Sequence, residues 1–275
     1  MARFKNTVWA LIVVVAIAGC QTTYTTPLTF DGGRVRIPQT LADDYRLDYP
    51  AAYARLGERP AGAKRPLYAK ARLEELTAKA PPGKRHPVIL YLHGCGGIWV
   101  SSTEHLDQLA SLQNFIVVAP DSFARQRPQF CFSNYTVDPS VYHEVVALRQ
   151  AEIRYTLARI AALPWVDKDN IFLIGHSQGG GLVAGYGGPV KLRGRVLING
   201  ACNAGLGGDG MRDDEALLTF DSGRDPWFVQ YSTDCRRYVL SHPNGQSIYE
   251  PESRSHNLAA TRWPELKAFL LKNLR

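Results

Sequence analysis

The chain has 275 residues, 45% of them hydrophobic and 21% charged, which is enough for one large α/β domain with a well-developed core. Lys and Arg outnumber Asp and Glu by 32 to 25, a net charge of +7, but the basic residues are scattered rather than gathered in a run or an aromatic-interleaved patch. This distribution argues against nucleic acid as a partner.

The first residues form a predicted targeting segment. Arg3 and Lys5 precede an uninterrupted apolar run over residues 8–18. That run is shorter than the roughly 20 residues of a membrane-spanning helix and suits the core of a signal peptide. It ends in Ile17-Ala18-Gly19-Cys20, which resembles the bacterial lipoprotein signal. In that signal the peptide is cut before the cysteine, which then carries lipid such as palmitate.

This resemblance implies a domain organisation and a location. Residues 1–19 are the expected signal peptide, residues 20–30 a tether lipidated at Cys20, and residues 31–275 the folded domain. Glutamine at position 21 resembles the outer-membrane sorting pattern, so we expect the bacterial cell envelope, on the periplasmic side of the outer membrane in a Gram-negative host. An ordinary secretory signal cleaved elsewhere is the alternative.

The predicted secondary structure alternates short apolar strands with helices. In chain order we expect an edge strand at 33–38, a helical segment at 68–76, a strand at 88–92, a helix at 103–113, a strand at 115–119, a helix beginning at Pro139, strands at 170–174, 195–199, 227–231 and 246–249, and a helix at 264–274. This alternation predicts an α/β fold, with a mostly parallel sheet covered by helices on both faces.

The most informative motif is Gly175-His176-Ser177-Gln178-Gly179, which directly follows the apolar run Ile171–Ile174. A serine hydroxyl needs a sharp strand-to-helix turn that exposes it to a base and to backbone N–H donors. Side chains two residues before and after the serine would collide in such a turn, so glycine is expected there. The motif therefore predicts a nucleophile elbow with Ser177 as nucleophile.

A glycine-bearing loop, His93-Gly94-Cys95-Gly96-Gly97, follows the predicted strand at 88–92. Such a loop can bring a backbone N–H close to the nucleophile, and the residue after the nucleophile supplies a second donor. We assign the oxyanion hole to the backbone of Cys95 and Gln178, with Gly96 as the alternative to Cys95. His93 precedes the nucleophile and is expected to be a structural hydrogen-bonding residue, while His176 is expected to point away from the elbow.

Together these segments resemble the α/β-hydrolase fold, and within it the dienelactone-hydrolase-like branch. The resemblance rests on residues 88–97, 117–125 and 163–180 and on the C-terminal strands, and it covers roughly residues 85–275. Dienelactone hydrolase uses a cysteine nucleophile whereas this elbow carries Ser177, so the resemblance implies a carboxylesterase rather than a lactonase. The interval 200–226 is too short for a large cap domain.

The resemblance also implies the chain order serine, acid, histidine for the catalytic residues. Asp234 follows the predicted strand at 227–231, and His256 follows the last predicted strand. Asp221 and Asp225 precede the former strand and His242 precedes the latter, so we expect them at the opposite edge.

In the predicted mechanism Ser177 attacks, His256 accepts and returns the proton, and Asp234 orients the imidazole. The expected function is hydrolysis of a small-molecule carboxylic ester through an acyl-enzyme. A serine peptidase or amidase of the same fold and a non-catalytic ligand-binding envelope lipoprotein are the alternatives. The spacing of the cysteines and the missing H-E-x-x-H predict no metal, and no cofactor is expected. The sequence does not predict an oligomeric state.

Four cysteines remain besides Cys20, and in an exported chain they are expected to pair, although the sequence alone permits three connectivities. In the fold that the resemblance implies, these cysteines follow neighbouring strands. It therefore implies the pairs Cys95–Cys131 and Cys202–Cys235 at the catalytic edge. Four buried free thiols are the alternative.

Overall fold

The computed structural model describes the strand segments 29–31, 34–36, 52–54 and 69–71, and residues 83–98, 100–112, 115–120, 122, 139–202, 211–228 and 234–275. The predicted signal peptide, Cys20, the start of the tether and Cys131 lie outside the described residues.

The structure is built on an eight-stranded sheet with the order β10-β9-β8-β7-β5-β6-β3-β4. The six strands β5 to β10 are parallel, and β3 and β4 add antiparallel pairs at one edge, which confirms the predicted mostly parallel sheet. The strands are β3 (Ala52–Ala54), β4 (Ala69–Ala71), β5 (His86–Leu92), β6 (Ile116–Pro120), β7 (Val166–His176), β8 (Gly194–Ile198), β9 (Ala216–Ser222) and β10 (Gly245–Glu250). A separate two-stranded pair joins β1 (Thr29–Asp31) and β2 (Arg34–Arg36).

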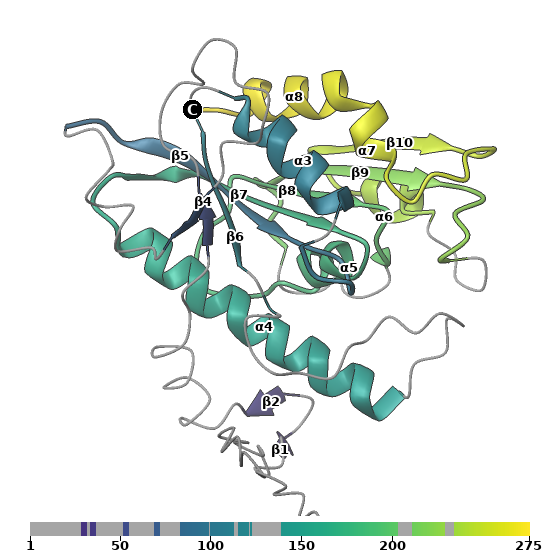
Figure 1. The fold of residues 1–275 in the computed structure, drawn as a ribbon, viewed down its shortest axis with the longest axis horizontal. Helices are drawn as coiled ribbons and strands as arrows, with labels where there is room; N and C mark the ends of the chain where they lie inside the picture. Colours follow the sequence, from purple (N-terminus) through teal and green to yellow (C-terminus); the bar gives the residue numbers. More distant parts are fainter. Residues whose placement is uncertain are drawn as a thin grey trace, which may run out of the picture.

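Helices cover both faces of the sheet (Figure 1). One face carries α3 (Val100–Ala110), α7 (Leu258–Thr261) and α8 (Trp263–Lys272), and the other carries α4 (Pro139–Ala162) and α5 (Gln178–Ala184), with α6 (Arg236–Val239) beside β9 and β10. Alternate residues of β5 enter two separate hydrophobic clusters, Leu90 with the α4 side and Ile89 with the α8 side. Strands buried on both faces in this way read as continuous apolar runs in the sequence.

Two predicted elements differ from the structure where it describes them. Of the strand expected at 227–231, Trp227 lies in a turn and is 40% exposed, and residues 229–231 lie outside the described residues. The strand that pairs with β8 is β9, whose residues are all buried. The helix expected at 68–76 is also not found where the structure describes this segment, since residues 69–71 form β4.

The carboxyl ends of the parallel strands meet at one edge of the sheet. Five loops that leave this edge carry polar residues, namely His93 after β5, Ser177 after β7, Asn199 after β8, Asp225 after β9 and His256 after β10. The fold therefore brings together residues that are far apart in the chain.

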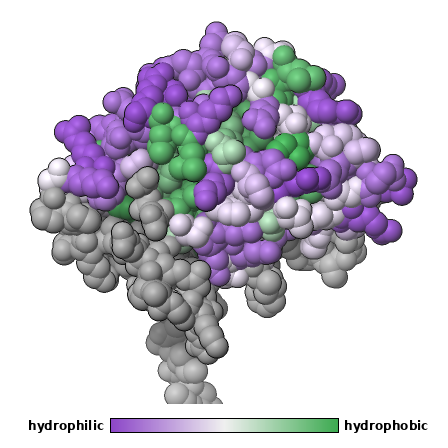
Figure 2. Space-filling view, turned by 90° about the horizontal axis from the view of Figure 1, so that it is seen from above, coloured by the Kyte–Doolittle hydropathy of each residue, from purple (hydrophilic) through white to green (hydrophobic). Residues whose placement is uncertain are grey.

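The described surface seen in Figure 2 is mainly hydrophilic, with hydrophobic residues in small separate groups. The large hydrophobic side chains that are exposed in the described residues are Trp227, Leu240 and Leu271, from three different segments. None of the helices that the structure describes has both the length and the apolar content needed to cross a membrane.

Candidate active site

Ser177 occupies a strained turn between β7 and α5. Its backbone has φ 56° and ψ −120°, a conformation that is uncommon for a residue with a side chain. The Ser177 N–H donates to Ile198 O at 2.8 Å, and Ser177 O accepts from Gly180 N at 2.9 Å. These bonds tie the turn to β8 on one side and to the first turn of α5 on the other, which is the geometry of the predicted elbow.

Both glycines of the motif are required by close backbone approach. A Cβ at Gly175 would lie 2.2 Å from Gly179 O, and a Cβ at Gly179 would lie 2.3 Å from Leu92 O. Both separations are far shorter than real carbon–oxygen contacts, so no side chain fits at either position. The elbow helix consequently packs directly on the end of β5.

His93 is a structural residue, as the sequence predicts. Its Nδ1–H donates to Gly94 O at 2.6 Å, since a carbonyl can only accept, and its Nε2 accepts the Ser122 N–H at 3.1 Å. Burial, together with the charge of Arg149, holds the pKa of His93 well below its usual value. The imidazole is therefore neutral and holds the loop after β5 in place.

The loop after β5 approaches Ser177 closely. A Cβ at Gly94 would lie 3.2 Å from Ser177 Cβ, and the Gly97 N–H donates to Gly94 O at 3.2 Å, which closes a turn around Cys95 and Gly96. The predicted donor residues Cys95 and Gln178 thus flank Ser177, one in this turn and one at the start of α5.

His256 is hydrogen-bonded to Asp225. The distance from His256 Nδ1 to Asp225 Oδ2 is 2.7 Å, and Asp225 is only 2% exposed. Because a carboxylate accepts, Nδ1 carries the proton and Nε2 of the neutral ring is the basic nitrogen. The His256 ring lies against three aromatic rings, with His176 at 4.9 Å, Trp227 at 5.4 Å and Phe228 at 5.6 Å between centroids.

Asn199, which sequence reasoning missed, holds the acid and histidine loops together. Its Nδ2 donates to Asp225 Oδ2 at 3.1 Å and to Ser255 O at 3.0 Å, while its Oδ1 accepts the Leu258 N–H at 2.9 Å. The Trp227 N–H donates to the other oxygen of Asp225 at 3.0 Å. Both carboxylate oxygens are therefore bonded, which offsets the cost of burying the charge.

His176, which the sequence predicts to point away from the elbow, reaches the backbone of His256. Its Nε2–H donates to His256 O at 2.6 Å. Burial, and next the charge of His256, lower the pKa of His176 to about 4, so it is neutral at pH 7. His176 thus supports the loop that carries His256.

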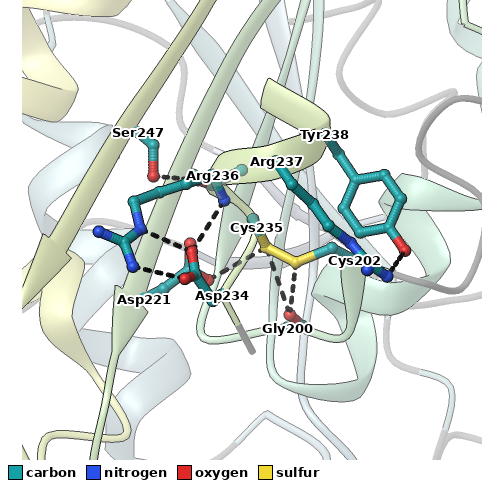
Figure 3. Close-up of a disulfide and its surroundings, with 10 residues drawn as sticks. Gly200, Cys202, Asp221, Asp234, Cys235, Arg236, Arg237, Tyr238 and Ser247 are labelled. Carbon is teal, nitrogen blue, oxygen red and sulfur yellow. Dashed lines mark hydrogen bonds and ion pairs between the residues drawn. A yellow bond between two sulfur atoms is a disulfide. The ribbon is translucent and has the colours of Figure 1, made fainter. Parts of the chain in front are cut away.

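The structure does not pair Asp234 with His256, which corrects the predicted acid. Arg236 Nε and Nη2 donate to the two oxygens of Asp234 at 2.7 and 2.5 Å, and this ion pair lowers the pKa of Asp234. Figure 3 shows the pair beside β9 and α6. The error follows from the misplaced strand, because with β9 at 216–222 it is Asp225, not Asp234, that lies just beyond the strand's carboxyl end.

The predicted Cys202–Cys235 disulfide is present, with a Cα–Cα distance of 5.5 Å (Figure 3). It links the loop after β8 to the start of α6. Cys95 is also disulfide-bonded, but Cys131 lies outside the described residues, so the Cys95–Cys131 pair stays a prediction.

Asp221, at the end of β9, lies beside this disulfide. It is fully buried, and its Oδ1 is 3.2 Å from the sulfur of Cys235. Burial raises the pKa of Asp221 to about 8, and the nearby Asp234 charge adds to the rise. Cys202, Asp221 and Cys235 are the one cluster of potential metal ligands among the described residues, but their two sulfurs are bonded to each other and are not thiolates.

Replacement of Asp221 by Asn is expected to remove a pH dependence of stability. The native state keeps the Asp221 proton up to about pH 8, whereas an unfolded Asp loses it near pH 4. This contribution to stability is therefore complete below about pH 4 and declines as the pH rises towards 8. Relative to wild type, Asp221→Asn should gain about 1–3 kcal/mol between pH 4 and pH 8, measured by urea unfolding.

The exposed Asp213 provides a matched control, because Asp213→Asn makes the same substitution at a carboxyl that is not buried. Stability curves for wild type and Asp221→Asn that run parallel from pH 4 to pH 8 would contradict the buried, protonated state of Asp221.

Comparison with known proteins adds a family match and structural likenesses. Residues 89–272 match the family model described as "Alpha/beta hydrolase family". No curated protein matches the sequence.

Solved structures with the same fold have low sequence identity to this chain. A phospholipase/carboxylesterase from Dyadobacter fermentans has a TM-score of 0.52 and 17% identity, covering 70% of this chain and 93% of that one. A protein described as a dienelactone hydrolase from Klebsiella pneumoniae has a TM-score of 0.51 and 14% identity, covering 81% and 99%. A Bacillus cereus carboxylesterase has a TM-score of 0.50 and 20% identity, covering 69% and 89%. At these identities the likeness concerns the fold alone.

Proposed function

This chain belongs to the alpha/beta hydrolase family, and on that premise we propose that it is a serine hydrolase that cleaves carboxylic esters of small molecules. The observation that carries the proposal is the hydrogen bond from His256 to the buried Asp225, at the sheet edge where the strained Ser177 turn lies. This arrangement leaves the basic nitrogen of His256 free of the acid, as a general base requires.

In the proposed reaction Ser177 Oγ attacks the ester carbonyl carbon while its proton passes to His256 Nε2. The tetrahedral intermediate collapses, the bond to the alcohol breaks, and His256 returns the proton to the leaving oxygen. Water then attacks the acyl-enzyme with the same proton relay, releasing the carboxylic acid and restoring Ser177. Asp225, rather than Asp234, keeps the imidazole in its Nδ1–H form and stabilises the imidazolium.

The negative oxygen of the intermediate is proposed to accept hydrogen bonds from the backbone N–H groups of Cys95 and Gln178. Two features support this assignment. The turn at Cys95 begins at Gly94, which packs against Ser177, and Gln178 is the first residue of α5. Backbone donors held in this way need no reorganisation when charge develops, which is the source of their catalytic effect.

A fluorophosphonate probe and a substrate panel test the proposal. We expect covalent labelling at Ser177, identified by peptide mass spectrometry, and turnover of short-chain nitrophenyl esters well above that of peptide anilides. Faster cleavage of the anilides would instead indicate a peptidase or amidase of the same fold. Binding of esters with neither labelling nor turnover would indicate a non-catalytic ligand-binding protein and would overturn the proposal.

We also propose that the protein is held at the bacterial cell envelope by lipid on Cys20. The support is the sequence pattern of residues 3–20, a short basic start and an apolar run that ends in small residues before the cysteine. A single acyl chain binds membranes only marginally, so stable attachment requires the several chains of a bacterial lipoprotein.

Substitution of Cys20 by Ser is accordingly expected to move the protein from the membrane pellet to the soluble fraction, because the lipid can no longer be attached. Immunoblotting of fractions after a carbonate wash measures this, with Cys202→Ser as a cysteine control that should stay in the pellet. A Cys20→Ser protein that remains as firmly membrane-bound as wild type would refute the lipoprotein assignment.

A further inference from the structure

A buried arginine joins the two segments that carry the proposed oxyanion donors. Arg149 of α4 donates from Nη1 to Gln178 Oε1 at 2.6 Å and from Nη2 to the backbone oxygen of His93 at 2.7 Å. The side chain is only 5% exposed. One planar guanidinium thus bridges the first residue of the elbow helix and the loop after β5.

The backbone that Arg149 holds on the β5 side lies next to the nucleophile. His93 O faces Gly179 as well, because a Cβ at Gly179 would lie 2.8 Å from it, and the following residue Gly94 packs on Ser177. A displacement of the His93 peptide would therefore move the turn at Cys95 relative to Ser177. Arg149 therefore contacts both of the segments that carry the donor amides.

A second contact from the same helix steadies the same loop. Glu152, one turn after Arg149, accepts a hydrogen bond from Ser122 Oγ at 2.5 Å, and the Ser122 N–H donates to His93 Nε2 at 3.1 Å. Helix α4 thus reaches His93 at its backbone through Arg149 and at its ring through Ser122. A buried polar network of this kind restricts the loop to one arrangement when its members are satisfied.

Burying a guanidinium is costly, and replacing a buried charged residue by an apolar one often leaves stability unchanged or raises it. A role in geometry explains Arg149 better than a role in stability. We propose that Arg149 is a positioning residue that sets the separation of the Cys95 and Gln178 amides. This inference rests on the proposed ester hydrolysis and adds to it a residue that does not touch the substrate.

Two substitutions of Arg149 separate its geometry from its charge. Arg149→Met keeps the length and loses both hydrogen bonds, so we expect kcat for a nitrophenyl ester to fall about 10- to 100-fold with KM changed less than about 3-fold. Arg149→Lys keeps the charge but lacks the planar fork, so kcat should stay at least about 5-fold below wild type. Full recovery by lysine would overturn the positioning role.

The affinity for a transition-state analogue is a measurement that a purely structural role of Arg149 would not change. A trifluoromethyl ketone forms a hemiketal with Ser177 whose oxygen occupies the oxyanion position. Its affinity should fall in parallel with kcat/KM across the Arg149 variants. Unchanged affinity for the ketone alongside a reduced kcat would overturn the inference.

A substitution of Gln178, the hydrogen-bond partner of Arg149, gives an independent test. Gln178→Ala removes the side-chain acceptor but keeps the backbone N–H, so it should also lower kcat. The double variant with Arg149→Met should be no slower than Arg149→Met alone, because both substitutions break the same bridge. If Arg149→Met does not fold, Gln178→Ala decides, and an unchanged kcat in that variant overturns the inference.

Arg193→Gln is the matched control. Its Nε donates to Asn273 O at 2.5 Å just before β8, at the edge of the sheet opposite Ser177, and its replacement should leave kcat unchanged. Failure of the wild-type protein to hydrolyse any ester would overturn the proposed function and this inference together. Wild-type hydrolysis with an unchanged kcat in folded Arg149→Met would overturn this inference alone.

Discussion

Replacement of Ser177 by Ala is expected to lower ester hydrolysis by about 10⁴-fold or more, because the nucleophile and its base act as a unit. The alanine Cβ fits where the serine Cβ lies, so the elbow, with its glycines at 175 and 179, should be retained. Initial rates with a nitrophenyl ester measure the loss, and His256→Ala should produce a loss of the same order.

The combined Ser177→Ala/His256→Ala variant supplies the control for a single catalytic unit. Its rate should be close to that of either single variant, since removing one member already abolishes the relay. Circular dichroism and thermal melting should show that each variant is folded. Wild-type turnover by a folded Ser177→Ala variant would refute the serine mechanism.

Replacement of Asp225 by Asn is expected to lower kcat by roughly 10³- to 10⁴-fold. The amide that replaces the carboxylate can donate to His256 Nδ1, which favours the tautomer with the proton on Nε2. In that form the imidazole cannot accept the serine proton. The expected loss therefore comes from the proton's place on the ring, and the fold should be preserved because Asp and Asn have the same shape.

Asp234→Asn is the matched comparison. Asp234 is paired with Arg236 at the surface, and exposed ion pairs contribute little to stability, so kcat should stay within about 2-fold of wild type. A large loss in Asp234→Asn together with normal activity in Asp225→Asn would reverse the assignment of the acid and show that the His256–Asp225 bond is not the catalytic one.

The confusion between these two aspartates shows where sequence reasoning reaches its limit. The run Trp227–Tyr231 is apolar and aromatic and reads as a strand, but Ala216–Ser222 is the strand that pairs with both β8 and β10. Burial of a strand is decided by its neighbours in the sheet, which are distant in the chain. Because residues 227–231 rather than 216–222 were expected to form this strand, the expected acid was Asp234 instead of Asp225.

Other parts of the site depend on local chain chemistry and could be predicted. Gly175 is required by the elbow's own backbone and Gly179 by the end of β5. His93 bonds Gly94 of its own loop and Ser122 of the loop after β6, and His256 follows β10, the last strand. The Cys202–Cys235 disulfide was expected only from the family resemblance, which places both cysteines after neighbouring parallel strands and therefore at the same edge of the sheet.

Apolar periodicity and glycine spacing act over a few residues, so the sequence predicted the parallel sheet and the turn at Ser177. Three contacts of the site appear only in the folded chain: Asp225 faces His256, Asn199 joins their loops, and Arg149 bridges His93 and Gln178. These contacts join segments 26 to 56 residues apart. The residue type of a polar side chain does not indicate its distant hydrogen-bond partner, because that partner depends on how the sheet and helices pack.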